Sequence, residues 1–149
     1  MLKLRKIDEN NFMDVFELEL DSGQEKYVSN PTRSLAQAYV YRNQCQPFGI
    51  YAGSIMVGYV LVIYDYETKE YNIWHMMIDK KYQRHGCGSE ALDLIINYIK
   101  TMPFGESTEI ILTCNRENYD GLNLFKKKGF KETGKSYEEE VEFVLPIIW

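Results

Sequence analysis

A short run of residues from Gln83 to Ser89 has the composition of a turn that binds a phosphate group. Its sequence is Gln-Arg-His-Gly-Cys-Gly-Ser, which fits the pattern Q/R-x-x-G-x-G/A. Glycine at positions 86 and 88 removes the Cβ atoms that would block the close approach of an anion to the backbone. Arg84 adds a mobile positive charge. Where such a turn opens a helix, free N–H groups and the positive end of the helix point at the anion.

The segments on both sides of this turn must position it. Residues 71–78 are rich in large side chains and predict a strand. From Gly86 onward the apolar residues recur at helical spacing, and four of them share one face: Leu92, Ile95, Ile96 and Ile99. The turn is therefore predicted to follow a strand and to open a helix.

The whole chain reads as one domain, 1–149, in which strands and helices alternate. Its 149 residues, 45% of them hydrophobic and 26% charged, are typical of a globular domain. Strands are predicted near residues 2–7, 48–51, 55–64, 71–78, 109–114, 130–133 and 141–145. Helices are predicted near residues 12–20, from 34 onward, from 86 to before 103, and over 118–128. This order predicts an α+β (mixed α/β) fold, with a mixed, mostly antiparallel sheet, helices on both faces and one βαβ unit that carries the turn.

Three local signals complete this outline. We expect Pro31 to break the chain, and Ser34 with Gln37 forms an S-x-x-Q capping box for the second helix. The apolar end of the chain, residues 146–149, is expected to extend a strand or to cover a partner subunit.

Two other glycine patterns compete with the phosphate turn. Residues 86–91 fit the dinucleotide form G-x-G-x-x-A, but the acidic residue expected about 20 positions later, Glu109, stands at the start of its strand rather than at its end. Residues 129–136 fit a Walker A motif literally. That motif follows a predicted helix and overlaps a predicted strand, whereas a P-loop follows a strand and opens a helix. The context therefore favours the turn at 83–89.

Charge and composition argue against several classes of protein. The net charge of −5 disfavours a nucleic-acid binder, and suits either a cationic ligand or an ordinary soluble surface. Three cysteines without a C-x-x-C pair favour a reducing cytoplasm, and two histidines make a metal site unexpected. We expect no membrane association, because no apolar run approaches the roughly 20 residues that span a bilayer and no signal peptide is evident.

With the turn placed between a strand and a helix, the chain resembles the GNAT superfamily of N-acetyltransferases. Residues 73–92, IWHMMIDKKYQRHGCGSEAL, look like the family's strand, loop and turn, and residues 118–130, NYDGLNLFKKKGF, resemble its late helix. Residues 24–41 look like bacterial spermine/spermidine (diamine) acetyltransferases. The resemblance implies the GNAT fold, acetyl-CoA as co-substrate, direct transfer to a primary amine such as spermidine or spermine, and a homodimer.

The resemblance also implies roles for individual residues. Main-chain groups of Met77 and Ile78 would pair with the pantetheine arm as an added strand does. Gln83 would order the turn, and Asn118 would lie near the pantetheine. Many family members carry at position 125 a tyrosine that protonates the departing thiolate, whereas this chain has Phe125, which has no proton to give. Six residues would hold the pyrophosphate by their backbone N–H groups: Arg84, His85, Gly86, Cys87, Gly88 and Ser89.

Two residue types could supply further chemistry. His75 lies on the strand beside the expected acetyl group and is a candidate base; the alternative is a histidine hydrogen-bonded within or beside the sheet. Cys87, at a helix N-terminus, and Cys114 are possible nucleophiles, although direct transfer needs no covalent intermediate.

A polyamine would need carboxylates and aromatic faces spaced along its ammonium groups. Glu17, Tyr39 and Trp74 are the candidate substrate residues, and further carboxylates follow Glu17 in the same segment. The alternative is a solvated helix face. A non-catalytic acetyl-CoA-binding module, and an enzyme for another amine such as a peptide or an aminoglycoside, stay open as alternative functions.

Overall fold

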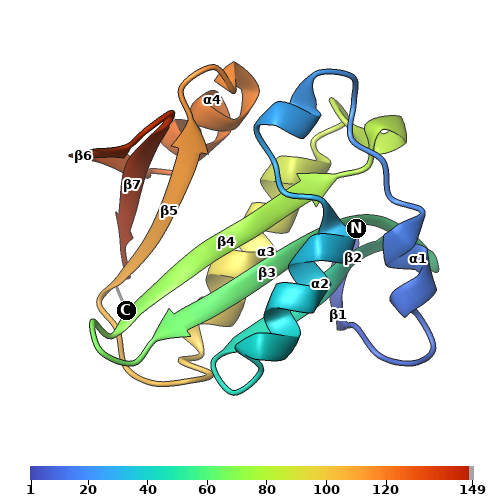
Figure 1. The fold of residues 1–149 in the computed structure, drawn as a ribbon, viewed down its shortest axis with the longest axis horizontal. Coiled ribbons are helices and arrows are strands. Elements are labelled where there is room, and N and C mark those ends of the chain that lie inside the picture. The colour runs from blue at the N-terminus through green and yellow to red at the C-terminus, as the bar shows by residue number, and fades with distance from the viewer. Residues whose placement is uncertain (148–149) are drawn as a thin grey trace.

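A seven-stranded sheet with helices on both faces forms the core of the computed structural model, which describes residues 1–147 (Figure 1). The strands are β1 (Leu2–Lys6), β2 (Cys45–Ala52), β3 (Ile55–Asp65), β4 (Glu70–Ile78), β5 (Glu109–Asn115), β6 (Lys131–Tyr137) and β7 (Glu140–Pro146). The helices are α1 (Phe12–Phe16), α2 (Pro31–Val40), α3 (Cys87–Lys100) and α4 (Tyr119–Lys127), with 3₁₀ turns η1 (Gln24–Lys26) and η2 (Lys80–Tyr82). The predicted order of strands and helices is confirmed.

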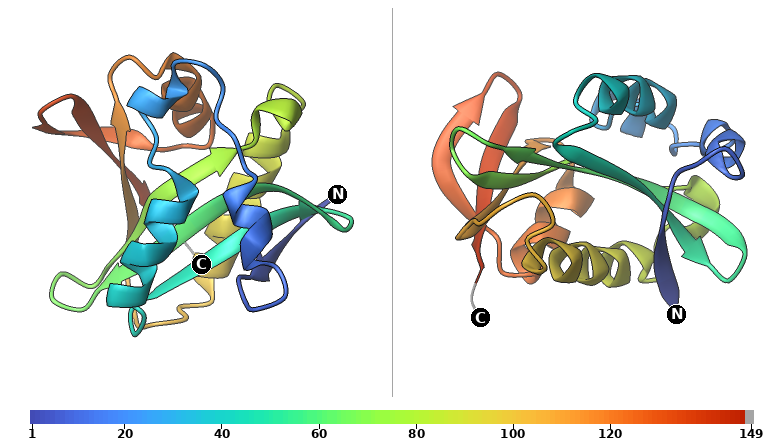
Figure 2. Two further views of the ribbon diagram at one scale, coloured as in Figure 1. Left: turned by 45° about the vertical axis from the view of Figure 1, so that its right-hand side comes forward. Right: turned by 90° about the horizontal axis from the view of Figure 1, so that it is seen from below.

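The sheet runs β1-β2-β3-β4-β5-β7-β6, and every neighbouring pair is antiparallel except β4 and β5. α3 connects these two parallel strands, so the predicted mixed sheet with one βαβ unit is confirmed. α1 and α2 lie on one face of the sheet, and α3 and α4 lie on the other (Figure 2).

Strand β3 explains why both faces are covered. Val60 and Val62 pack with the apolar face of α3, whereas Tyr59 and Leu61 pack with residues of α1 and α2. Successive side chains of a strand point to opposite faces, so a strand that is apolar at every position must be covered on both sides.

Strands β4 and β5 stay together for only a short distance. Their register joins Tyr71 to Ile110 and Asn72 to Ile111, and beyond these pairs the two strands diverge (Figure 1). β4 also contains an irregularity at Trp74, because Leu61 faces His75 while the next residue, Val62, faces Ile73. The second half of β4 is therefore free of β5 along one edge.

Helix α2 begins earlier than predicted. Asn30 is its N-cap, and the Asn30 side chain accepts hydrogen bonds from the N–H groups of Thr32 at 2.8 Å and Arg33 at 3.3 Å. Pro31 opens the helix instead of breaking the chain, because the first helical residue needs no N–H donor. The expected capping box of Ser34 and Gln37 is thus wrong, and Ser34 is a buried residue in the middle of the helix.

Two further expectations are corrected or limited by the structure. α1 ends at Phe16, so Leu20 does not continue that helix. The Walker A pattern at residues 129–136 runs into the exposed edge strand β6, not into a helix, as its sequence context indicated. Of the apolar end, Pro146 completes β7, while Ile148 and Trp149 lie outside the described residues.

Candidate active site

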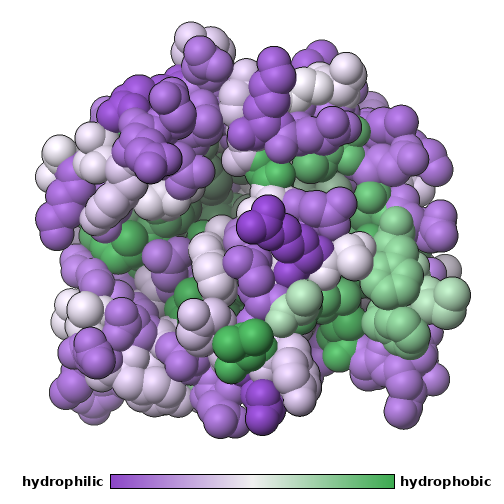
Figure 3. Space-filling view, viewed as in Figure 1, coloured by the Kyte–Doolittle hydropathy of each residue, from purple (hydrophilic) through white to green (hydrophobic). Residues whose placement is uncertain are grey.

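A cavity of about 360 Å³ lies beside the second half of β4. Its lining comes from four segments far apart in the sequence: the end of β4, the turn that precedes α3 with the start of α3, the first turns of α4, and residues 20–28. On the space-filling surface a recess separates the β5–α4 side from this last segment (Figure 3). The lining residues are Leu20, Gln24, Val28, Met76, Met77, Ile78, Gln83, Arg84, Gly86, Gly88, Ser89, Asn118, Asp120, Gly121, Leu124 and Phe125.

The turn before α3 has the geometry of an anion site. Gly86 is the N-cap of α3 with a φ of 83°, and Arg84 also has a positive φ, of 65°. No side chain caps α3, so the N–H groups of its first turn have no partner within the helix. A Cβ atom at Gly86 would meet nothing within 4 Å, which leaves open space for a ligand beside the backbone. Free N–H groups, a helix dipole and the guanidinium of Arg84 together fit a phosphate group.

The edge of β4 offers a second kind of contact. Met77 and Ile78 pair with Tyr59 and Gly58 of β3 on one side, while the pairing with β5 on the other side ends at Asn72. Main-chain groups on an open strand edge can bind an extended, amide-bearing chain as a further strand would.

Helix α4 closes the cavity opposite the turn. Asn118 caps this helix, because its Oδ1 accepts a hydrogen bond of 3.2 Å from the N–H of Gly121. The Phe125 ring packs edge-on against Phe130, with 5.9 Å between ring centroids, and lies 6.4 Å from Phe143. Phe125 therefore presents a fixed apolar face to the cavity.

Two residues predicted to bind the cofactor have side chains that do not line the cavity. His85 and Cys87 belong to the turn, but neither side chain lines the cavity. Cys114 lies under the start of α4, and burial raises the pKa of its thiol to about 11. A thiol with that pKa is protonated at neutral pH, which argues against Cys114 as a nucleophile.

The imidazole of His75 lies in a buried hydrogen-bond chain rather than in the cavity. The Ser34 hydroxyl lies 2.6 Å from Nδ1 of His75 and 2.9 Å from the Tyr59 hydroxyl. Both hydroxyls find an acceptor when Tyr59 donates to Ser34 and Ser34 donates to Nδ1 of His75. In that arrangement the neutral imidazole carries its proton on Nε2. Burial, and then the charge of Arg33, lowers the pKa of His75 to about 4. His75 is thus neutral at pH 7.

Comparison with known proteins decides the family. The model of the acetyltransferase (GNAT) family matches residues 12–130. The chain belongs to the GNAT acetyltransferase family. The match includes the turn before α3, the open half of β4 and the whole of α4. None of the curated proteins matches the chain.

Solved acetyltransferases share this GNAT fold at low sequence identity. The spermidine N-acetyltransferase of Vibrio cholerae, in complex with CoA and spermine, is 18% identical, with a TM-score of 0.78 over 97% of this chain and 95% of that one. The Salmonella typhimurium enzyme that modifies the N-terminal serine of ribosomal protein L7/L12 is 15% identical, with a TM-score of 0.78 over 99% and 95%. The PaiA N-acetyltransferase of Thermoplasma acidophilum, in complex with coenzyme A, is 14% identical, with a TM-score of 0.74 over 99% of each chain.

The three substrate residues expected from the sequence do not meet at the cavity of this GNAT domain. Tyr39 is exposed on α2 and stacks under Arg42, with 4.7 Å from the guanidinium carbon to the ring centroid. Trp74 stacks on His75 at 4.8 Å between ring centroids. Glu17 is exposed at the end of α1. None of the three lines the cavity.

Residues 20–28 form a wall of the cavity, which was not predicted from the sequence. Leu20, Gln24 and Val28 line the cavity, whereas the neighbouring carboxylates of Glu19 and Glu25 are exposed. The signal was present as apolar positions recurring within an otherwise charged segment. The prediction of a cationic substrate favoured the carboxylates of this segment instead. No local sequence pattern shows which side of an irregular segment faces a distant helix.

Residues 1–147 contain neither a group of side chains for a metal ion nor a helix that could span a membrane. No three His, Cys, Asp or Glu side chains in this part of the chain are grouped so that they could hold a metal ion. In the same residues, no helix has the length and the apolar character needed to cross a membrane.

Proposed function

We propose that this protein is an acetyl-CoA-dependent N-acetyltransferase that moves an acetyl group directly to a primary amine. The observation that carries the proposal is that the anion-binding turn and the open edge of β4 line one cavity. In the reaction the amine nitrogen forms a bond to the acetyl carbon while the carbon–sulfur bond breaks. The electron pair of that bond leaves on sulfur, and the proton of the amine passes to water or to the thiolate.

The turn residues would hold the pyrophosphate of the co-substrate. Arg84 and Gly86 to Ser89 line the cavity or open α3 beside it, and His85 and Cys87 would contribute through their backbone N–H groups. Met77 and Ile78 would pair with the pantetheine amides along the open strand edge, and Asn118 would lie close to the same arm. Solved neighbours with bound CoA support this assignment.

Deprotonation of the amine and departure of the thiolate would depend on the pKa values of the two substrates more than on groups of the protein. Among the described residues that line the cavity, Arg84 and Asp120 carry the side chains that ionise. A thiol has a pKa near 8.5, so thiolate is a tolerable leaving group without an acid at Phe125. A neutral His75 with Nδ1 engaged is poorly placed to act as base, so we propose that the amine enters already deprotonated.

A polyamine such as spermidine or spermine is the first candidate acceptor. The net charge of −5, the exposed carboxylates next in sequence to the lining residues Leu20 and Gln24, and the Vibrio neighbour with bound spermine support it. A peptide amine is the second candidate. Leu20 and Val28 give the cavity an apolar wall, and among the lining residues Asp120 is the one carboxylate that could bind an ammonium group. The Salmonella neighbour modifies the N-terminal serine of a ribosomal protein.

Acetyl transfer to a panel of amines tests the proposal. The protein is incubated with acetyl-CoA and spermidine, spermine, lysine peptides or aminoglycosides, and release of the CoA thiol is followed against a sample without protein. Release with one class identifies the acceptor. Tight binding of acetyl-CoA without release for any amine would support the non-catalytic alternative. Light scattering tests the homodimer implied by the family resemblance, and cell fractionation tests the cytoplasmic location.

A further inference from the structure

Residues 19–28, here called the wall segment, form one side of the cavity and lie far in the sequence from the turn at residues 83–89. The segment is irregular except for η1, and it contributes Leu20, Gln24 and Val28 to the lining. It passes over the end of β4, where the loop toward α3 begins (Figure 1). The shape of this side of the cavity therefore depends on the contacts that hold the irregular segment against the rest of the protein.

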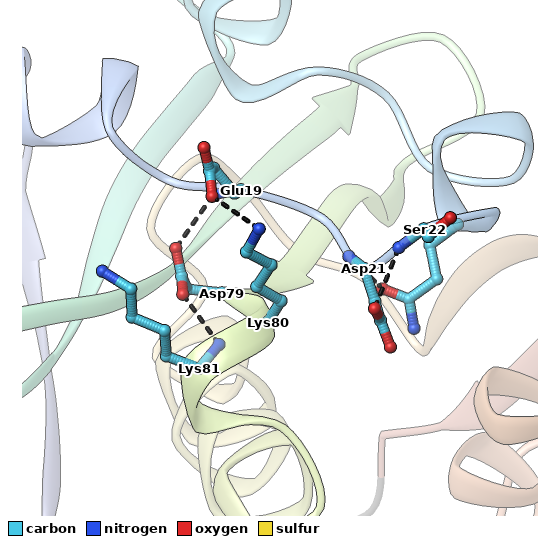
Figure 4. Close-up of polar contacts among 7 residues, drawn as sticks. Glu19, Asp21, Ser22, Asp79, Lys80 and Lys81 are labelled. Atoms are coloured by element: carbon cyan, nitrogen blue, oxygen red, sulfur yellow. Dashed lines mark hydrogen bonds and ion pairs between the residues drawn. The ribbon is translucent and has the colours of Figure 1, made fainter.

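The first part of the wall segment is fastened to the loop at Asp79. The buried Asp79 carboxylate accepts a hydrogen bond of 2.9 Å from the N–H of Glu19, and its other oxygen accepts one of 2.9 Å from the N–H of Lys81. The N–H of Lys80 donates to the carbonyl of Glu19 at 2.8 Å. The Lys80 ammonium lies 2.9 Å from the Glu19 carboxylate in an exposed ion pair (Figure 4).

The second fastening joins the wall segment to the anion-binding turn. The amides of Gln24 and Gln83 pair reciprocally: Nε2 of Gln24 donates to Oε1 of Gln83 at 3.1 Å, and Nε2 of Gln83 donates to Oε1 of Gln24 at 2.8 Å. The second hydrogen of Gln83 Nε2 goes to the carbonyl of Ile78 at 2.8 Å. Oε1 of Gln24 also accepts from the N–H of Asp21 at 3.2 Å. One side-chain pair thus connects the end of β4, the turn and the wall segment.

We infer that Gln24 is a positioning residue, which through its amide pair with Gln83 holds the wall segment and the anion-binding turn in one fixed arrangement. The inference rests on the proposed function, since the turn is the proposed pyrophosphate site. Coupling between two sites is reciprocal. If the turn orders the wall, the wall also orders the turn, so cutting the pair must weaken cofactor binding even though Gln24 makes no bond to the backbone of the turn.

Glutamine is suited to this position because only an amide offers a donor and an acceptor side by side. A leucine at position 24 keeps the volume and removes both functions. A net hydrogen bond changes an equilibrium by roughly two- to tenfold. The substitution removes both bonds of the pair with Gln83 and also the bond from the N–H of Asp21. We therefore expect CoA to bind about five- to tenfold more weakly to the Gln24→Leu protein.

The test is a double-mutant cycle on CoA affinity, measured by calorimetry with the full chain. The variants are Gln24→Leu, Gln83→Leu and the double variant, and Lys26→Leu is the matched control because Lys26 is exposed on the same 3₁₀ turn. Gln83→Leu should weaken CoA more than Gln24→Leu does, and the double variant should be no weaker than Gln83→Leu alone. Lys26→Leu should bind CoA as the unchanged protein does.

Hydrogen exchange on the same proteins separates positioning from general loss of stability. In Gln24→Leu the amides of residues 19–28 should exchange faster, while those of β3 and α3 keep their rates. The inference is overturned if the losses of CoA binding free energy in Gln24→Leu and Gln83→Leu add in the double variant. It is also overturned if Gln24→Leu binds CoA within twofold of the unchanged protein. If Gln24→Leu does not fold, Gln24→Asn replaces it, because the shorter amide no longer reaches Gln83. Faster exchange confined to residues 19–28 with weaker CoA binding is again required. Absence of CoA binding by the unchanged protein would instead refute the proposed function.

Discussion

The hydroxyl of Ser34 lies 2.6 Å from Nδ1 of His75, on the buried face of α2. The pKa of this histidine is about 4 in the folded protein, against an ordinary value of 6.5. Between these two values the unfolded chain binds more protons than the folded one, so the folded state loses stability as the pH falls. The contribution of neutral His75 is fully present above pH 6.5.

The first prediction concerns this acid sensitivity. From pH 7 to pH 5 the free energy of unfolding should fall by about 2 kcal/mol more in the unchanged protein than in His75→Gln, which cannot titrate. Urea unfolding at the two pH values measures the difference. His85 is the other histidine of the chain and is exposed, so His85→Gln should keep the full pH dependence. An equal fall in all three proteins would show that His75 is charged in the folded state at pH 5.

The second prediction concerns the backbone of the turn at residues 83–89, which we propose binds the pyrophosphate. Gly86 has a φ of 83°, which side chains with a Cβ atom rarely adopt. Gly86→Val should bind CoA at least about 100-fold more weakly, because the turn must shift and the new side chain enters the ligand's approach. Calorimetry with CoA measures the loss.

Gly134 provides a matched control for backbone strain. Its φ is 91°, and a Cβ atom there would also meet nothing within 4 Å, but it lies on the edge strand β6. Gly134→Val should lose a similar free energy of unfolding, about 1–3 kcal/mol, and keep its CoA affinity. If both valine variants bind CoA equally, the turn at Gly86 is not the phosphate site.

Much of this fold could be predicted because its signals are local. The glycines at 86 and 88 and the apolar face of α3 stand within one continuous stretch, so the strand, turn and helix were visible in the sequence. The start of α2 was missed although Asn30-Pro31 is a strong cap, because Ser34 and Gln37 offered a competing local pattern.

The missed part of the site depends on contacts between distant segments. Ser34 is buried where it contacts Tyr59 and His75, which come from two different strands. Gln24 is held at the cavity by Gln83, which lies 59 residues away in the sequence. No spacing rule connects such pairs. The same limit explains why Glu17, Tyr39 and Trp74 were favoured over residues that line the cavity.

The third prediction concerns Phe125, which stands where many family members carry a tyrosine. Phe125→Tyr would place a hydroxyl at a ring that already lines the cavity. If the departing thiolate lacks an acid, the variant should turn over at least about tenfold faster at pH 7.5, since a general acid contributes on the order of 10²–10⁴. Phe125→Leu is the control, because it alters the packing without adding a proton donor. Equal rates in Phe125→Tyr and the unchanged protein would mean that thiolate departure does not limit the reaction.

The last prediction concerns the pH dependence of acetyl transfer. A primary amine has a pKa near 10, so its neutral fraction rises tenfold per pH unit below that value. With no base contributed by the cavity lining, kcat/KM for a primary amine should rise by the same factor from pH 6.5 to about pH 9, after subtraction of the rate without protein. Asp120→Asn and His75→Gln should show the same slope. A plateau above pH 7 that disappears in His75→Gln would instead identify His75 as the base, and one that disappears in Asp120→Asn would assign that role to Asp120.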